Sequence, residues 1–209
     1  MFFCLTDKPE RYCIYGNAMR CKITVAAIVL IVAFASTAMP NEETNNRKEK
    51  ENSVSQETEK DFNNKYAAGL NNLVWSLLEK EDRTEGENAS MISSAHASLY
   101  HWSRIGTDIN LQRGQWLISH VYAVLNMPES ALYHADRCLK ITVQNNLKDF
   151  DLAYAYEAMA RAYAVSKNRN EALKYMGLAE QAGNSIEKQE DKDLFFSDFN
   201  AEPWYGIKK

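Results

Sequence analysis

The sequence predicts an all-α protein, and three features carry that prediction. Only four prolines and eight glycines occur in 209 residues, so few positions break a helix. Between residues 62 and 182, apolar side chains recur at the spacing of amphipathic helices. The stretch 149–164, DFDLAYAYEAMARAYA, is apolar around most of its circumference and rich in alanine, as expected of a central helix that its neighbours approach closely.

An uncharged apolar run, residues 23–39, precedes the polar part of the chain. Its 17 residues are at the lower limit for crossing a bilayer, and we expect one hydrophobic helix there. As a signal anchor, it would hold the domain at the membrane outside the cytoplasm, with the basic segment 1–22 inside. As a signal peptide cleaved at the small-residue sites 33–35 or 36–38, it would release the domain to the periplasm or the medium.

Both interpretations of the apolar run stay open, with a buried core helix as a third. A start of translation at Met19 would favour cleavage, because residues 19–22 would then form a compact basic leader and residues 1–18 would not be made. The membrane is therefore an expected partner through residues 23–39 unless that segment is removed.

A charged and polar segment follows, residues 40–60. Val54 is its only aliphatic side chain apart from the first residue, a proline, so the segment cannot bury enough surface to offset the entropy of ordering it. We expect a disordered linker there, then a helical domain over residues 61–206 and a short tail at 207–209.

Six helices and a final helical turn or two are predicted within the domain. Asp108 is expected as an N-cap, and Pro128 is a favoured first-turn residue. Gly106 and Gly183 are expected just past the ends of two helices. The helices span, in order, residues 62–80, 88–105, 109–126, 128–144, 149–164 and 170–182, with the last turns at 191–199.

A repeat relates the third and fourth predicted helices to the fifth and sixth. The letters YAV at 122–124 recur at 163–165, and AL at 131–132 recurs at 172–173, which is a period of 41 residues. This pattern resembles the tetratricopeptide repeat (TPR), which has a small residue, an aromatic residue three positions later and an alanine early in the second helix. The matching positions are Ser119, Tyr122 and Ala131, then Ala160, Tyr163 and Ala172, with Cys138 and Ala179 at a later small position.

The resemblance covers about 75 residues and departs from the family in two ways. The period exceeds the usual ~34 residues, so extra residues near 145–151 must lengthen a helix or a turn, and the closing proline is absent. Residues 62–105 fit as a diverged third helix pair. The text from Tyr100 to the final PWYG also resembles a group of small bacterial TPR-like proteins, which adds support for the fold alone.

The TPR resemblance implies about three antiparallel helix pairs and an aromatic C-terminal cap. Repeat stacks need their open ends covered, and the tail is expected to pack on residues 170–182 for that purpose. Its aromatic residues are Phe195, Phe196, Phe199, Trp204 and Tyr205.

The resemblance also implies a binding groove. In TPR families the first helix of each pair lines a concave face through three motif positions, and the residues at those positions here are Arg113, Trp116 and His120, then Tyr154, Glu157 and Arg161. Helical periodicity alone leaves the second trio as the polar stripe of residues 149–164, so two lines of reasoning meet on the same side chains. We therefore expect a non-catalytic module that binds an unknown protein or peptide.

Other interpretations of these residues remain. Glu157 and Arg161 could form an i,i+4 salt bridge on a solvated face, and Trp116 could pack against residues 88–105. The rival functions are an enzyme that uses His120 with Glu157 and a structural subunit that self-associates through the aromatic tail. Asp149 and Asp151 are expected to cap the fifth helix, with paired carboxylates for chemistry as the alternative.

Charge and cysteine content exclude several function classes. The net charge of −4 and pI near 5.7, without a basic patch, argue against a nucleic-acid partner. No metal-ligand spacing occurs, so we expect neither a metal nor another cofactor. Cys138 is the only cysteine after the apolar run and cannot form a disulfide within the domain.

Overall fold

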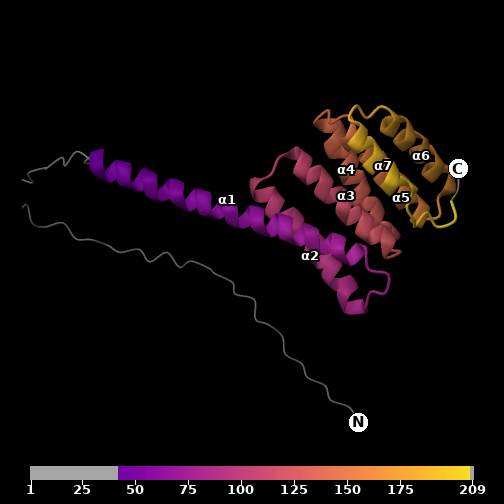
Figure 1. Cartoon of the computed structure of the whole chain (residues 1–209), viewed down its shortest axis with the longest axis horizontal. Coiled ribbons are helices and arrows are strands. Elements are labelled where there is room, and N and C mark those ends of the chain that lie inside the picture. The colour runs from indigo at the N-terminus through magenta and orange to yellow at the C-terminus, as the bar shows by residue number, and fades with distance from the viewer. Residues whose placement is uncertain (1–41, 208–209) are drawn as a thin grey trace, which may run out of the picture. The chain divides into compact units, whose positions relative to one another are not determined.

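The computed structural model describes residues 42–207, and over that range it contains seven α-helices and no strand. Successive helices pack as antiparallel pairs, α1 on α2, α3 on α4 and α5 on α6, and α7 follows (Figure 1). This confirms the all-α prediction and the sequential pairing. The bounds are α1 Glu42–Leu78, α2 Glu85–Ile105, α3 Asp108–Val124, α4 Pro128–Gln144, α5 Phe150–Val165, α6 Arg169–Asn184 and α7 Gln189–Asn200.

Helix α1 is longer than the sequence analysis predicts. The segment expected to be a disordered linker is helical from Glu42 and continuous with the helix expected from residue 62. Residues 41–68 contain no proline or glycine and are rich in glutamate, lysine and glutamine, which favour helix. The described side chains before Asn63 are nevertheless exposed, and Asn63 is the first buried one. A lack of apolar residues thus predicts the lack of packing here, and not the lack of a helix.

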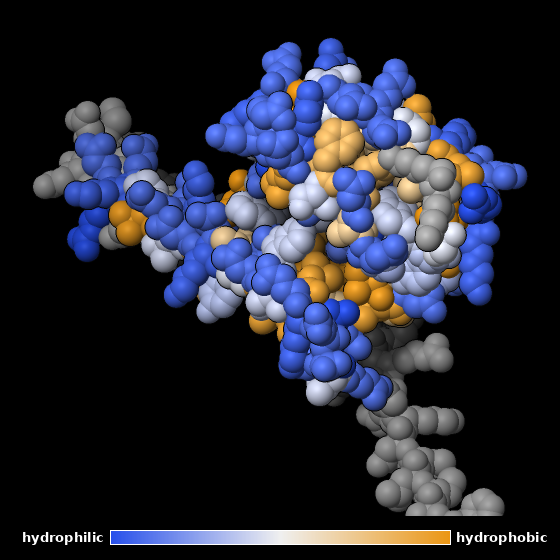
Figure 2. Space-filling model, turned by 45° about the vertical axis from the view of Figure 1, so that its right-hand side comes forward, coloured by the Kyte–Doolittle hydropathy of each residue, from blue (hydrophilic) through white to orange (hydrophobic). Residues whose placement is uncertain are grey.

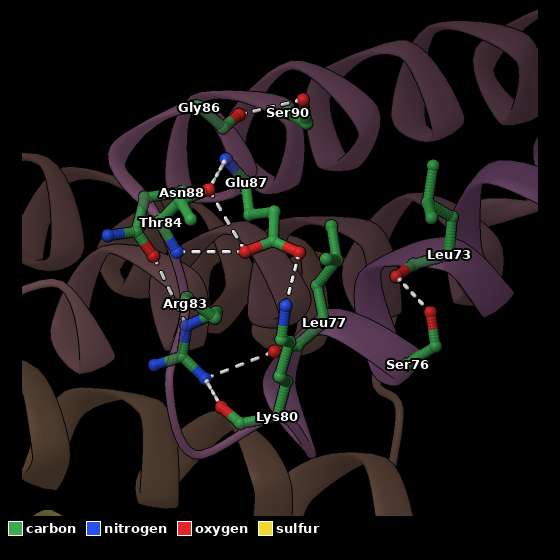
Figure 3. A network of polar contacts seen from close by, with 10 residues as sticks. All are labelled: Leu73, Ser76, Leu77, Lys80, Arg83, Thr84, Gly86, Glu87, Asn88 and Ser90. Atoms are coloured by element: carbon green, nitrogen blue, oxygen red, sulfur yellow. Dashed lines mark hydrogen bonds and ion pairs between the residues drawn. The ribbon is translucent and has the colours of Figure 1, made fainter.

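Side chains close the connection between α1 and α2 (Figure 3). Arg83 Nη1 donates to the carbonyl oxygens of Leu77 and Lys80 at 3.0 and 2.7 Å, which satisfies carbonyls that the end of α1 leaves unpaired. Thr84 and Glu87 form a capping box at the start of α2. Hydrogen bonds from Lys80 and Thr84 lower the pKa of Glu87 to about 2. The turn is therefore fixed without a glycine.

Helix α5 is the central helix, as its composition predicts. It packs against α3, α4, α6 and α7, and most of its residues are buried, six of them alanines. Alanine side chains let neighbouring helix axes approach closely, so α5 can contact four helices at once.

The 41-residue repeat is visible in the geometry of the helix pairs. The turns after α3 and α5 place Asn126 and Lys167 at φ 58° and 57°, and these positions are one period apart. Tyr122 stacks on an α4 ring at 5.7 Å between centroids, and Tyr163 stacks on an α6 ring at 5.6 Å. Both inner helices of the repeat, α3 and α5, also pack against each other.

Several helix ends differ from the predictions. The N-cap of α3 is Thr107, one residue before the expected Asp108. Gly183 lies inside α6 and does not end it, because the ring of Phe195 packs where a β-carbon would stand. Asp149 occupies the N-cap position of α5 without a capping hydrogen bond, and its Oδ1 accepts from the backbone of the α6–α7 connection at 3.1 Å. Close packing and contacts distant in sequence thus override the local end signals.

The C-terminal segment, which we define as residues 189–207, forms a buried aromatic cluster. Phe195, Phe199 and Trp204 are each at most 6% exposed, and Phe199 lies between the other two rings at centroid distances of 5.4 and 5.6 Å. Helix α7 packs on α5 as well as on α6. The chain then continues toward α3, where the Tyr205 hydroxyl donates to the carbonyl of Ala123. The aromatic cap is confirmed, but it extends beyond α6 to α5 and α3.

No helix within residues 42–207 is long and apolar enough to cross a membrane. The apolar run 23–39 and the segment 1–22 lie outside the described residues, so the membrane and export predictions remain predictions.

Candidate binding pocket on the inner face

The inner face of the stack, defined here as the side formed by α1, α3, α5 and α7, brings the six predicted residues together around Trp116. Its indole Nε1 donates to Glu157 Oε2 at 2.7 Å. Its ring stacks on His120 at 5.2 Å and meets the edge of Tyr154 at 5.0 Å. Trp116 and Glu157 are one repeat apart, so the hydrogen bond joins equivalent positions of adjacent repeats.

Glu157 and Arg161 form the expected i,i+4 pair, but both side chains are only 1% exposed. The Nε–Oε1 distance is 2.5 Å. Arg161 also donates to the carbonyl oxygens of Asp198, Ala201 and Pro203 at 3.1 to 3.2 Å. These two charges therefore lie in the interior, and neither the solvated-face interpretation nor direct ligand contact by Arg161 describes this arrangement.

The C-terminal segment covers Arg161. The indole of Trp204 lies 4.2 Å from the guanidinium carbon, a cation–π contact, and the Trp204 Nε1 donates to the carbonyl of Phe199. The part of the groove where the polar stripe of α5 was expected to meet a ligand is thus occupied by the protein's own tail. This is a non-local contact that helical periodicity does not report.

His120 is partly buried against Trp116, and its Nδ1 has no hydrogen-bond partner within the protein. Burial and the nearby Arg161 guanidinium lower the pKa of His120 to about 3. The imidazole is therefore neutral at physiological pH. A base with this pKa accepts a proton only weakly near neutrality.

Arg113 is the predicted residue that remains most accessible, with a side chain that is 55% exposed. Its Nε donates to Asp151 Oδ1 at 2.8 Å, and its guanidinium lies 5.4 Å from the centre of the Phe150 ring. Asp151 therefore pairs with α3, and this contact replaces the capping role expected for it at the start of α5. On the other side of the pocket, the Tyr154 hydroxyl donates to Asp198 Oδ2 at 2.7 Å.

An open pocket of about 540 Å³ remains on the inner face between α1 and α7. A second hollow of about 260 Å³ adjoins it and shares the walls Trp75, Glu79, Trp116 and Asp198. The combined volume is in the range of small-molecule and side-chain pockets. In the space-filling view, hydrophobic surface lies beside α1 at its junction with the rest of the domain (Figure 2). The larger pocket is lined by Asn71, Trp75, Glu79, Gln112, Arg113, Trp116, Leu117, Phe150, Asp151, Tyr154, Leu194 and Asp198.

The sequence analysis missed the walls that α1 and α7 contribute. Trp75 stacks on Trp116 at 5.9 Å, and Asp198 accepts from Tyr154. The signal was present, because Trp75, Trp116, Glu157 and Asp198 follow one another at intervals of 41 residues. The residue types change from aromatic to acidic along this series, so a search for similar letters does not find it.

Metal ligation is not suggested within residues 42–207, where no group of three or more His, Cys, Asp or Glu side chains could hold an ion. Cys138 is a buried free thiol that accepts a hydrogen bond from Gln112 at 3.2 Å, and burial raises its pKa. Comparisons with protein-family models, with curated proteins and with solved structures find no match for this chain. The pocket must therefore be interpreted from its own geometry.

Proposed function

We propose that this protein is a non-catalytic helical-repeat module of the TPR type that binds a peptide or protein segment in the inner-face pocket. The observation that carries the proposal is the pocket itself, whose walls come from four helices and include the side chains of Trp75, Trp116 and Tyr154. Aromatic residues in a concave, partly accessible site are typical of binding anchors.

The TPR assignment is supported by the motif positions and by the two matching helix-pair turns. The small residue Ser119 donates to the carbonyl of Ala131 at 2.9 Å, which ties the two helices of the first repeat together at the expected positions. The longer period is the main departure from the family.

Binding is favoured over catalysis by the state of the predicted acid–base pair. Both carboxylate oxygens of Glu157 accept hydrogen bonds, one from Trp116 and one from Arg161. The His120 imidazole has a pKa of about 3. Self-association through the tail is also disfavoured, because Phe195, Phe199 and Trp204 are buried within the protein's own domain.

A selection of peptides from a random display library on the purified full chain tests the proposal. The Trp75→Ala variant removes one pocket wall, and we expect it to weaken binding of the selected peptides by about tenfold or more, a loss of about 1.4 kcal/mol or more. Tyr133→Ala is the matched control, since Tyr133 is an exposed aromatic residue on α4 that does not line the pocket. Selected peptides that bind the Trp75 variant as well as the wild type would contradict the proposal.

We further propose that residues 23–39 direct the protein to a membrane or to export, either as an anchor or as a cleaved signal. The support is the uncharged apolar run and its basic flank. Fractionation of cells that express the full chain, with N-terminal sequencing of the product, separates the two forms. Recovery of the uncleaved chain in the soluble cytoplasmic fraction would contradict both.

A further inference from the structure

The two joined hollows differ from a general apolar groove in their charge. Carboxylates from three helices and the tail surround them, namely Glu79, Asp151, Asp198 and Glu202, whereas Arg113 is the only cation that lines either hollow. Arg113 is also already paired with Asp151. The remaining carboxylates therefore give the pocket a negative potential that favours a cationic ligand.

The wall facing these carboxylates is aromatic. Trp75 and Trp116 stack on each other at an interplanar angle of 27°, and both line the larger and the smaller hollow. Indole faces attract cations, and guanidinium groups stack on them particularly well. The same protein makes this contact between Arg161 and Trp204 at 4.2 Å.

Unpaired polar atoms give a second and independent indication. Among the described residues, two buried side-chain polar atoms have no hydrogen-bond partner within the protein, Gln112 Oε1 and His120 Nδ1. Gln112 is fully buried and lines the larger hollow, and His120 lines the smaller one. Buried polar atoms are rarely left unpaired, and an amide oxygen can only accept, so the Gln112 position points to a ligand that donates N–H groups.

We propose that the joined pocket binds the arginine side chain of an extended peptide, with the guanidinium against Trp75 and Trp116 and its N–H groups directed to Glu79, Asp198 and Glu202. This inference rests on the proposed peptide-binding function and names its ligand class. Glu79 and Glu202 occupy equivalent positions two repeats apart from His120 and Arg161 in the same 41-residue series, so the two carboxylates flank the site from α1 and from the tail. Arginine is favoured over lysine because its planar group can stack and donate at the same time.

The test is a calorimetric titration of the full chain with short peptides that differ only in one central residue, flanked by leucines. The central residue is arginine, lysine, citrulline or glutamate. Citrulline keeps the shape of arginine and most of its donors but has no charge. We expect the arginine peptide to bind about tenfold more tightly than the citrulline peptide, since charged hydrogen bonds exceed neutral ones by about this factor, and the glutamate peptide to bind more weakly still.

The variant that tests the carboxylates is the double substitution Glu79→Gln and Glu202→Gln, which changes two exposed side chains. It is expected to lower the affinity for the arginine peptide about tenfold and to leave the citrulline affinity unchanged. Glu129→Gln, an exposed acid on α4 outside both hollows, is the control for net charge and is expected to change neither affinity.

Three results would overturn the inference. The first is equal affinity for the arginine and citrulline peptides; if Trp75→Ala still weakens both, peptide binding in the pocket stands and only the cationic specificity fails. The second is no binding of the arginine peptide up to about 1 mM, a binding free energy weaker than about 4 kcal/mol. The third is binding of free arginine amide as tight as that of the peptide, which makes the pocket a site for a small molecule.

Discussion

The guanidinium of Arg161 connects α5 to the C-terminal segment, so replacing it with methionine should loosen both. Methionine has a similar length and keeps the apolar part of the packing, but it removes the partner of Glu157 and the donors to three carbonyl oxygens. Because the Glu157 side chain is 1% exposed, its carboxylate would be left buried with one hydrogen bond, from Trp116.

The expected cost of Arg161→Met is about 3–5 kcal/mol of unfolding free energy, which is the usual cost of breaking a buried ion pair by removing one partner. Domains of this size are stabilised by about 5–15 kcal/mol in total, so the change should be large in a urea titration followed by tryptophan fluorescence. Limited proteolysis under native conditions should also cut the C-terminal segment of the variant earlier than that of the wild type.

The control for this prediction removes both charges. In the double variant Arg161→Met and Glu157→Gln, the glutamine oxygen can still accept from the Trp116 indole, and no unpaired charge remains. Replacing a buried ion pair by neutral groups is often close to neutral in stability, so the double variant should recover to within about 2 kcal/mol of the wild type. If the single variant loses less than about 1 kcal/mol, or if the double variant is no more stable than the single one, the clamp described here does not hold the segment.

Three further outcomes are expected. Gly183→Ala should destabilise the protein by about 1–3 kcal/mol because its β-carbon would stand 2.3 Å from a Phe195 ring carbon, whereas Gly177→Ala, with nothing within 4 Å in the same helix, should stabilise it by about 0.5–1 kcal/mol in thermal melts. Burial lowers the pKa of His134 to about 4, so the unfolded chain binds a proton that the folded chain does not between pH 6.5 and 4; stability should fall with pH across that window, and less steeply, by up to one proton, in His134→Gln. Cys138 is buried with a raised pKa and should react with a thiol reagent only at the rate of unfolding. A thiol that reacts fast in the native state, an unchanged pH slope, or equal effects of the two alanines would each contradict the corresponding prediction.

The helix pairs could be predicted because their signals are local. Helix α4 begins at Pro128 and ends at Gln144 as expected, since the first-turn proline and the apolar spacing both lie within the segment. The repeat also fixed which face of α3 and α5 turns inward, and Trp116 and Glu157 do meet there. These features depend on spacing along one helix or between two similar ones.

The remaining features depend on contacts that no local pattern contains. Gly183 has the sequence of a helix end but lies inside α6, because Phe195 from the next helix needs the space that a side chain would fill. The burial of Arg161 likewise depends on where the tail packs. Trp75 and Asp198 follow the repeat period, but their residue types differ from those at the equivalent positions, and only the packing reveals the equivalence.

The burial of Glu157 and Arg161 gives the pocket a rigid back wall, and this favours the binding proposal. Trp116 is held by the Glu157 hydrogen bond, by stacking on His120 and by the edge contact with Tyr154, so its ring has little freedom to lose when a ligand arrives. A preorganised aromatic anchor reduces the entropic cost of association. Since the tail already covers the α5 end of the inner face, a ligand can contact this anchor only from the side of α1, where Trp75 and Glu79 stand. The protein's own C-terminal segment therefore restricts recognition to the α1 side of the stack.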